Sequence, residues 1–487
     1  MDQTSPGASA SLYWIRFHHA HTRAWSPAVF LGLLTGCLAT ANIVTEAPND
    51  TKSSPRLSRL ERNYFALPPE PASPGPSSFS PEAPLTPLAG YSEDYWIALS
   101  NLDLTALRNA AQSEPEIGFA EGLALLAGGE HERAESAFVV TSRQAIDVNV
   151  AVASQIMLAK SLLYRRKWTT LRDLTISSGL ASADRGSTAE LEKWGKAFAG
   201  VDEQTATVPE KPVSLHLGIT AVGTPTVRVR INGKEYDFWL DTGSSMTVLS
   251  SRVAADARVP IVSPDTLNIG TFQGVAPVRP AIVKRLEIGP IVFGNTPAIV
   301  MDAGLMRIKS TAEGVTGAGL RVDGIIGWDI IRQLDITMDY EEETITIEQP
   351  VRAETNGTAL QNLVWLGKPL VQVTTTSGTI FHFTLDTGAQ STFLNAAILE
   401  RMGVVTETRG GRVFGFNKTG GKTERVIPAL TLGIAGVSLR LERVIVYGPS
   451  LTSLINTDGI LGSDIARFGK IRIDATNGVF SVGDKER

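Results

Sequence analysis

The chain has 487 residues, of which 43% are hydrophobic, and a formal net charge of −5 at pH 7. At roughly 150 residues per folded unit, this length predicts about three units with ordinary soluble cores. Basic residues do not outnumber acidic ones, so the composition gives no support to nucleic-acid binding.

Residues 1–37 have the features of a bacterial export signal. Arg16 and Arg23 precede a short apolar stretch that ends in Leu-Thr-Gly-Cys at Cys37. This ending resembles the lipobox of bacterial lipoproteins, in which the cysteine is lipidated. Cys37 is the single cysteine, so no disulfide can form within the chain. We expect a lipid anchor at Cys37 and a bacterial cell-envelope location, facing the periplasm or outer surface; an ordinary signal peptide with an incidental cysteine is the alternative.

The next two segments differ in composition. Residues 38–90 are rich in Pro, Ser and Ala and predict a disordered tether. Residues 91–200 show apolar residues at helical spacing and predict an α-helical, repeat-like domain. Gly122, Ala134 and Phe138 sit at spacings that resemble a tetratricopeptide-type helical pair. Such a domain would bind a protein partner or present a substrate; a plain helical bundle and a pro-segment that occludes a cleft are the alternatives.

The triplet Asp-Thr-Gly occurs twice, and its surroundings repeat with it. Asp241 and Asp386 begin the two copies, 145 positions apart (386 minus 241). Gly233 and Gly378, which mark X-Gly hairpin turns before each triplet, keep the same offset. Each triplet therefore follows the second strand of a hairpin. One copy alone would indicate only an ordinary turn.

A second signature also occurs twice, once after each triplet. It reads Asp-Gly-Ile-Ile-Gly from Asp323 and Asp-Gly-Ile-Leu-Gly from Asp458, and a strand pair follows each copy. The chain thus contains two copies of one β unit, which we place at 211–349 and 358–487. Together with residues 91–200, this predicts a multidomain, mainly β fold with an N-terminal helical domain.

Each copy contains two apolar residues followed by Asp-Thr-Gly-[Ser/Ala], and later an apolar-apolar-Gly strand. This pattern resembles that of the retropepsin-like aspartic proteases. Two such lobes in one chain resemble the pepsin-like arrangement, and the likeness covers roughly residues 213–487. It implies a catalytic dyad of Asp241 and Asp386, a peptide or protein substrate, and neither metal nor cofactor. Thr242 and Thr387 would hydrogen-bond across the lobes. The resemblance also implies that Gly243, Ser244, Gly388 and Ala389 support the two loops. The strands beneath the loops would contain Ile325, Ile326, Gly327, Ile460, Leu461 and Gly462.

The implied mechanism follows from two close carboxyls. Two carboxylates within about 3 Å cannot both ionise, so they share a proton. The ionised partner activates water, and the protonated partner polarises the scissile carbonyl. Ser244 follows the first triplet and Ala389 the second, so a hydroxyl donor on one side alone predicts unequal carboxyls and a working pH nearer neutral than that of a strongly acidic digestive protease.

The family also covers its cleft with a flap hairpin. Phe272 and Gly274 in one copy, and Phe414 and Gly415 in the other, are the flap candidates, with ordinary surface hairpins as the alternative. The six histidines show no metal-ligand spacing, so we predict no metal site. The sequence therefore predicts an envelope-anchored aspartic endopeptidase. The alternatives are a peptide-binding lipoprotein that uses the same cleft without cutting, and lobes that pair with those of another chain.

Overall fold

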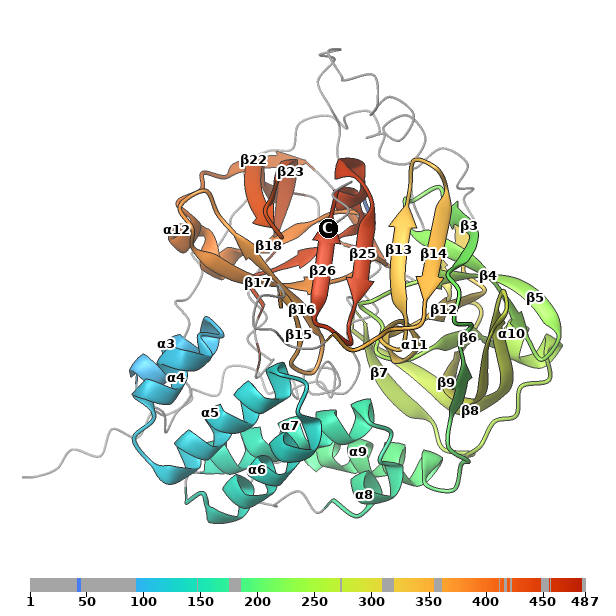
Figure 1. The fold of residues 1–487 in the computed structure, drawn as a ribbon, viewed down its shortest axis with the longest axis horizontal. Helices are drawn as coiled ribbons and strands as arrows, with labels where there is room; N and C mark the ends of the chain where they lie inside the picture. The colour runs from blue at the N-terminus through green and yellow to red at the C-terminus, as the bar shows by residue number, and fades with distance from the viewer. Residues whose placement is uncertain are drawn as a thin grey trace, which may run out of the picture.

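A computed structural model gives the architecture of most of the chain. The residues that it describes are 42–44, 93–146, 148–174, 185–271, 274–308, 319–353, 361–410, 412–415, 418–420, 423–447, 455 and 457–483. Helices fill the N-terminal part and strands the rest, as Figure 1 shows in blue-green and in green to red. The fold is therefore mainly β with an N-terminal α-helical domain, as the sequence predicts. Cys37, the rest of segment 1–37 and most of 38–90 lie outside the described residues.

The helical domain is built from pairs of neighbouring helices. Its elements are α3 (Glu93–Ser100), α4 (Leu104–Ala110), α5 (Glu114–Ala127), α6 (His131–Gln144), α7 (Val148–Tyr164), α8 (Trp168–Arg172) and α9 (Arg185–Phe198). Helix α5 begins at a capping box of Ser113 and Glu116. A Cβ added to Gly122 would lie 2.5 Å from the Phe138 ring, so α5 and α6 pack very closely. The tetratricopeptide assignment stays a prediction. None of the helices in the described part of the chain is long and apolar enough to cross a membrane.

Six strands of the first lobe close into a barrel. In pairing order they are β4 (Pro225–Ile231), β5 (Lys234–Leu240), β12 (Gly324–Ile326), β6 (Val248–Ser250), β9 (Ile291–Met301) and β8 (Gly274–Ile288), which pairs back with β4. Asn232 and Gly233, with φ of 47° and 89°, form the predicted tight turn between β4 and β5. The lobe also contains β2 (Thr205–Thr207), α10 (Ser251–Asp256), β7 (Leu267–Thr271), β10 (Arg307–Ile308), β11 (Leu320–Arg321) and α11 (Trp328–Ile331).

The second lobe repeats this barrel. Its ring is β16 (Pro369–Thr374), β17 (Ile380–Leu385), β24 (Gly459–Leu461), β18 (Phe393–Asn395), β23 (Val437–Tyr447) and β22 (Thr423–Ile434), which pairs back with β16. Around it lie β15 (Leu363–Trp365), η1 (Ala396–Ile398), α12 (Leu399–Met402), β19 (Glu407–Gly410), β20 (Arg412–Gly415), β21 (Lys418–Gly420) and η2 (Ser463–Phe468). Strand β1 (Asn42–Val44), from the stretch expected to be a tether, pairs with β20.

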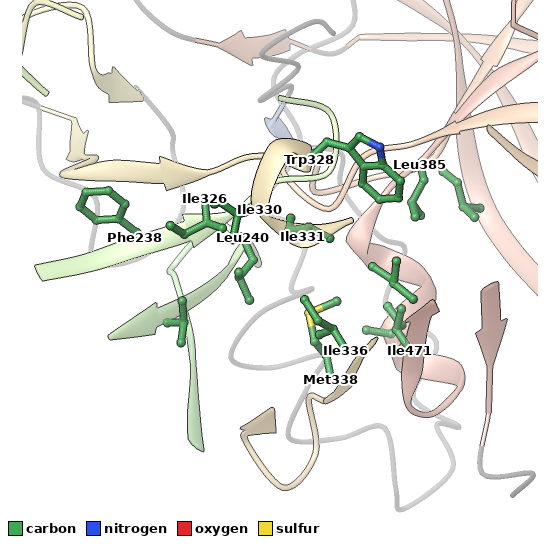
Figure 2. Packing of buried hydrophobic residues seen from close by; sticks show 14 of the residues in the cluster. Phe238, Leu240, Ile326, Trp328, Ile330, Ile331, Ile336, Met338, Leu385 and Ile471 are labelled. Carbon is green, nitrogen blue, oxygen red and sulfur yellow. The ribbon is translucent and has the colours of Figure 1, made fainter. Parts of the chain in front are cut away.

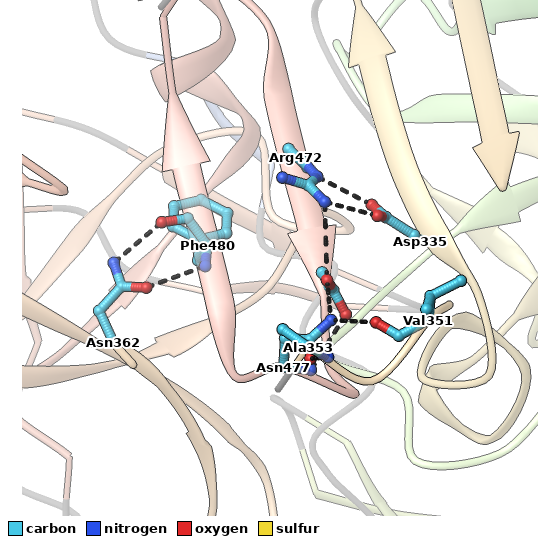
Figure 3. Close-up of polar contacts among 8 residues, drawn as sticks. Asp335, Val351, Ala353, Asn362, Arg472, Asn477 and Phe480 are labelled. Atoms are coloured by element: carbon cyan, nitrogen blue, oxygen red, sulfur yellow. Dashed lines mark hydrogen bonds and ion pairs between the residues drawn. The ribbon is translucent and has the colours of Figure 1, made fainter. Parts of the chain in front are cut away.

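A shared sheet joins the two lobes. Strands β13 (Asp335–Asp339) and β14 (Thr344–Glu348) of the first lobe continue into β25 (Ile471–Asp474) and β26 (Val479–Val482) of the second, with β3 (Val213–Ile219) beyond β14. Across the β13–β25 boundary, Arg472 makes a two-pronged ion pair with Asp335, at 3.0 and 2.6 Å (Figure 3). The two lobes of one chain therefore pair with each other.

One apolar core runs through both lobes. Phe238, Leu240 and Ile326 pack beneath the first triplet, while Leu385 and Ile471 enter from the second lobe (Figure 2). The alternation of buried and exposed residues along β4 explains how a barrel strand fills the core with one face and meets water with the other. The core fixes the ends of β5 and β17, where the triplets begin.

Candidate active site

Each triplet lies at the end of a strand that pairs in parallel with an apolar-apolar-Gly strand. Ile326 pairs with Leu240 in the first lobe, and Leu461 pairs with Leu385 in the second. The Asp241 N–H donates to the Ile326 carbonyl and the Asp386 N–H to the Leu461 carbonyl, each at 3.0 Å. Ile325, Ile326 and Leu461 are buried and Ile460 is half-buried. The predicted strands thus run directly beside both aspartates.

The glycine of each apolar-apolar-Gly strand allows a close approach to the opposite side of its own loop. A Cβ on Gly327 would lie 2.5 Å from the Met246 carbonyl oxygen, and one on Gly462 would lie 2.4 Å from the Ser391 carbonyl oxygen. Contacts below 3.0 Å are essentially never made by real Cβ atoms. Both positions therefore require glycine for the loop to close over the strand.

Two threonines hold the loops of the two lobes together. The Thr242 hydroxyl donates to the Leu385 carbonyl at 2.8 Å, and the Thr387 hydroxyl donates to the Leu240 carbonyl at 2.7 Å. Each hydroxyl also accepts from the N–H of the other threonine, at 3.1 and 3.0 Å. All four bonds are buried and cross the lobe boundary, as the family resemblance implies. The position of one aspartate is therefore fixed relative to the other.

The triplet glycines let each carboxyl reach the opposite loop. A Cβ on Gly243 would lie 2.6 Å from Cγ of Asp386, and one on Gly388 would lie 2.5 Å from Cγ of Asp241. Both aspartates are almost fully buried, with 0% and 1% of their surface exposed. The fold thus brings together two carboxyls that start 145 residues apart (386 minus 241).

Backbone amides hold the near oxygen of each carboxyl. Oδ1 of Asp241 accepts from the N–H groups of Gly243 at 2.9 Å and Ser244 at 3.1 Å. Oδ1 of Asp386 accepts from the Ala389 N–H at 3.0 Å. Burial raises the pKa of Asp241 to about 6, while hydrogen bonds from Asp386 and from the N–H groups of Gly243, Ser244 and Gly388 act in the opposite direction. Such a carboxyl can hold or release a proton at mildly acidic pH.

The prediction that the Ser244 hydroxyl donates a hydrogen bond to the carboxyl of Asp241 is wrong. That hydroxyl donates to the Met246 carbonyl at 2.8 Å, and only the backbone N–H of Ser244 reaches Asp241. Ala389 supplies the same backbone donor in the second lobe. The side chains after the two triplets therefore do not make the carboxyls unequal in the way predicted. A working pH nearer neutral than that of a strongly acidic digestive protease stays a prediction, and its support is now the burial that raises the pKa of Asp241.

The flap candidates are placed only in part. Phe272 lies outside the described residues, and Gly274 begins β8 opposite Thr271, so β7 and β8 form a hairpin. Phe414 and Gly415 lie in β20, which pairs with β21. Both candidates are thus adjacent to or within antiparallel pairs, as a flap requires. Their role in covering a ligand stays a prediction.

A threonine–aspartate pair supports the loop that carries each triplet, buried in the first lobe and partly buried in the second, and sequence reasoning gave it no role. Thr247 donates to Oδ1 of Asp329 at 3.1 Å, and Thr392 donates to Oδ1 of Asp464 at 2.7 Å. Burial raises the pKa of Asp329 to about 6 and also raises the pKa of Asp464. The signal was present in the repeats, because both members of each pair recur in both copies.

One comparison with known protein families matches part of the first lobe. Residues 227–330 match the model of a family described as aspartyl protease. The match includes the first triplet and the first apolar-apolar-Gly strand. No curated protein matches the chain. Among solved structures, a retropepsin-like aspartic protease from Rickettsia conorii is similar at 13% identity and a TM-score of 0.20, over 30% of this chain and 94% of that one.

Proposed function

We propose that the protein is an aspartic-type endopeptidase that hydrolyses peptide bonds between its two lobes. The observation that supports this most directly is the placement of Asp241 and Asp386, each against the glycine of the opposite triplet. The cross-lobe threonine bonds hold that placement in a site almost closed to bulk water. The aspartyl protease match over residues 227–330 supports the same reaction class.

The reaction divides between the two carboxyls. The ionised aspartate accepts a proton from a water held between the carboxyls, and that water attacks the scissile carbonyl carbon. The protonated aspartate hydrogen-bonds the carbonyl oxygen, and a proton then passes to the leaving nitrogen as the C–N bond breaks. Which aspartate is ionised belongs to the pair, since their titrations are coupled.

Cleavage of a diverse peptide library by the full chain tests the proposal. Asp241→Asn and Asp386→Asn should each abolish cleavage, because both carboxyls serve one water. Circular dichroism and thermal melting would verify that the variants fold. Absence of cleavage by the folded wild-type chain across pH 3 to 8 would contradict the proposal. It would then favour the alternative of a protein that binds peptides in the same cleft without cutting them.

We also propose that the protein is lipid-anchored in a bacterial envelope through Cys37. The support is the Leu-Thr-Gly-Cys ending of the export-like segment. Cys37→Ser should move the protein from the membrane fraction to the soluble envelope fraction, and should remove labelling by a palmitate analogue. Equal membrane retention of the variant would contradict the anchor. A protein partner on the helical domain remains a further proposal, to be tested by cross-linking in cells.

A further inference from the structure

A small cavity lies where the helical domain meets both lobes. Helix α7 and the residues after it supply Lys160 and Arg166, the first lobe supplies Ser245, Trp328 and Asp329, and the second supplies Trp365. Its volume is about 40 Å³. Since a water needs roughly 10–15 Å³ by this measure, the cavity holds a group of about two or three heavy atoms.

The cavity adjoins the catalytic loop of the first lobe. Ser245 and Met246, which line it, follow Asp241 by four and five positions (245 minus 241 and 246 minus 241). The backbone N–H of Trp328 donates to the backbone carbonyl of Ser244 at 2.7 Å. A group held in this cavity is therefore connected by short, rigid contacts to the loop that holds Asp241.

Cationic side chains outnumber acidic ones among the residues that line the cavity, and the rest of the wall is mostly apolar and aromatic. Lys160, Arg166 and Arg332 line it together with Asp329 as the single carboxylate among the lining residues. Arg166 donates to the Asp329 carbonyl at 2.8 Å, and the Arg332 guanidinium lies 3.7 Å from the centre of the Tyr164 ring. Burial, together with Arg332, lowers the pKa of Arg166 to about 10. An anion in the cavity would offset this crowding of positive charge.

Two buried polar atoms of the lining residues have no hydrogen-bond partner in the described part of the chain. They are Nε1 of Trp328, a donor, and Oδ2 of Asp329. Trp328 is only 3% exposed, so bulk water does not satisfy its indole N–H. Burial raises the pKa of Asp329 to about 6, so in mildly acidic solution its carboxyl can also donate. Both atoms suit a ligand that accepts hydrogen bonds.

We propose that this cavity receives a carboxylate of the peptide substrate, so that the helical domain forms part of the substrate-binding surface. The inference rests on the proposed function. A carboxylate has two acceptor oxygens, fits the volume, and matches the excess of cations over carboxyls in the lining and the donors of Trp328 and Arg166. The carboxylate is either the substrate's C-terminus or an Asp or Glu side chain a fixed number of residues from the cut bond.

Matched peptides test the proposal with the unmodified full chain. Peptides that the protein cleaves would be compared with copies that carry a C-terminal carboxamide, or Gln and Asn in place of each Glu and Asp. We expect one of these changes to lower kcat/KM by about tenfold or more, because a buried charge-assisted contact is lost. The position of the sensitive carboxylate distinguishes the C-terminus from a side chain.

Variants assign the preference to the cavity. Arg166→Gln should reduce or remove the preference for the acidic peptide, and Arg166→Lys should retain part of it. Arg133→Gln alters an exposed ion pair on α6 and should leave the preference unchanged. Equal kcat/KM for every acidic and neutral pair would overturn the proposal. So would an undiminished preference in a folded Arg166→Gln variant.

Calorimetry with Asp241→Asn separates this inference from the proposed function. The variant should bind the acidic peptide more tightly than its neutral copy, by about tenfold or more. Selective binding without any wild-type cleavage would uphold the cavity and contradict the endopeptidase. Cleavage by the wild type without selective binding by the variant would support the endopeptidase and contradict the cavity proposal. Absence of binding by every peptide would overturn the cavity proposal.

Discussion

At the scale of single residues, the site depends on small side chains as much as on acidic ones. Gly243 and Gly388 are the positions where each lobe admits the carboxyl of the other. Any side chain there occupies the space that the opposite aspartate now fills. The two glycines therefore explain why the triplet needs its third residue in both copies.

Gly243→Ala tests this explanation. Its Cβ would lie 2.6 Å from Cγ of Asp386, so the carboxyl or the loop must move. We expect kcat/KM to fall by about 100-fold or more, since misplacement of reacting groups by about 1 Å has that effect. Gly233→Ala, at an open turn position outside the site, is the control for a strained glycine backbone and should alter stability more than activity. Full activity of Gly243→Ala would contradict the close approach.

The raised pKa of Asp241 predicts a pH dependence of catalysis. The reaction needs one protonated and one ionised carboxyl, and burial raises the pKa of Asp241 to about 6. We therefore expect kcat/KM to fall as the pH rises above about 6, because the shared proton is lost. A pH–rate profile on one peptide measures this. A maximum below about pH 3 would contradict the account.

The same pKa predicts a pH dependence of stability. Asp241 titrates near pH 4 in the unfolded chain and at about pH 6 in the fold, so the folded state binds more protons between these values. The free energy of unfolding should thus fall as the pH rises through this window. Asp241→Asn should remove a share on the order of 2 kcal/mol. Burial also raises the pKa of Asp329 and of Asp458 to about 6, so the variant would retain the pH dependence of stability that these two residues contribute. An identical decline in wild type and variant would contradict this assignment.

At the scale of elements, the shared sheet fixes the lobes and its edge is held by a side chain. Asn362 is buried and pairs with the backbone of Phe480 in β26, with both bonds at 2.9 Å (Figure 3). The side-chain amide of Asn362 therefore makes the pair of hydrogen bonds that the backbone of a neighbouring strand would make with β26. The Arg472–Asp335 pair, by contrast, is partly exposed and joins β25 to β13.

Asn362→Ala should destabilise the fold more than Arg472→Ala. The first change leaves a buried N–H and carbonyl of Phe480 without their side-chain partner, which costs about 2 to 4 kcal/mol. The second removes a partly exposed ion pair, which contributes about 1 kcal/mol or less. Urea unfolding monitored by circular dichroism measures both. A larger effect at Arg472 would show that the ion pair between β25 and β13 stabilises the shared sheet more than the amide at the β26 edge does.

Sequence reasoning succeeded where a local pattern was repeated and failed where distant segments meet. The two triplets, their hairpins and the apolar-apolar-Gly strands follow from short motifs with fixed strand periodicity. The direction of the Ser244 hydroxyl depends on the carbonyl of Met246 across a tight loop, which no local pattern specifies. The contact of Arg166 with Asp329 joins residues 163 positions apart, and degenerate helical spacing gave no sign of it.

At the scale of the whole molecule, the helical domain and the two lobes form a connected unit. Tyr164 at the end of α7 lies beneath Arg332 of the first lobe, and its ring centre is 4.2 Å from that of Trp365 in the second. The helical domain thus lies beside Ser245 and Met246, in the loop that carries the first triplet. This placement supports the proposed role in substrate binding over the alternative of a plain bundle that only packs on the two lobes.

In the proposed active site, each of the two lobes contributes one carboxyl to a single catalytic unit. A double-mutant cycle on one cleaved peptide tests it most directly, with Asp241→Asn, Asp386→Asn and the double variant compared by kcat/KM. We predict that each single change removes nearly all activity and that the double change removes no more, because residues acting as one unit are strongly non-additive. Substantial activity in either folded single variant, or additive losses, would contradict a shared dyad.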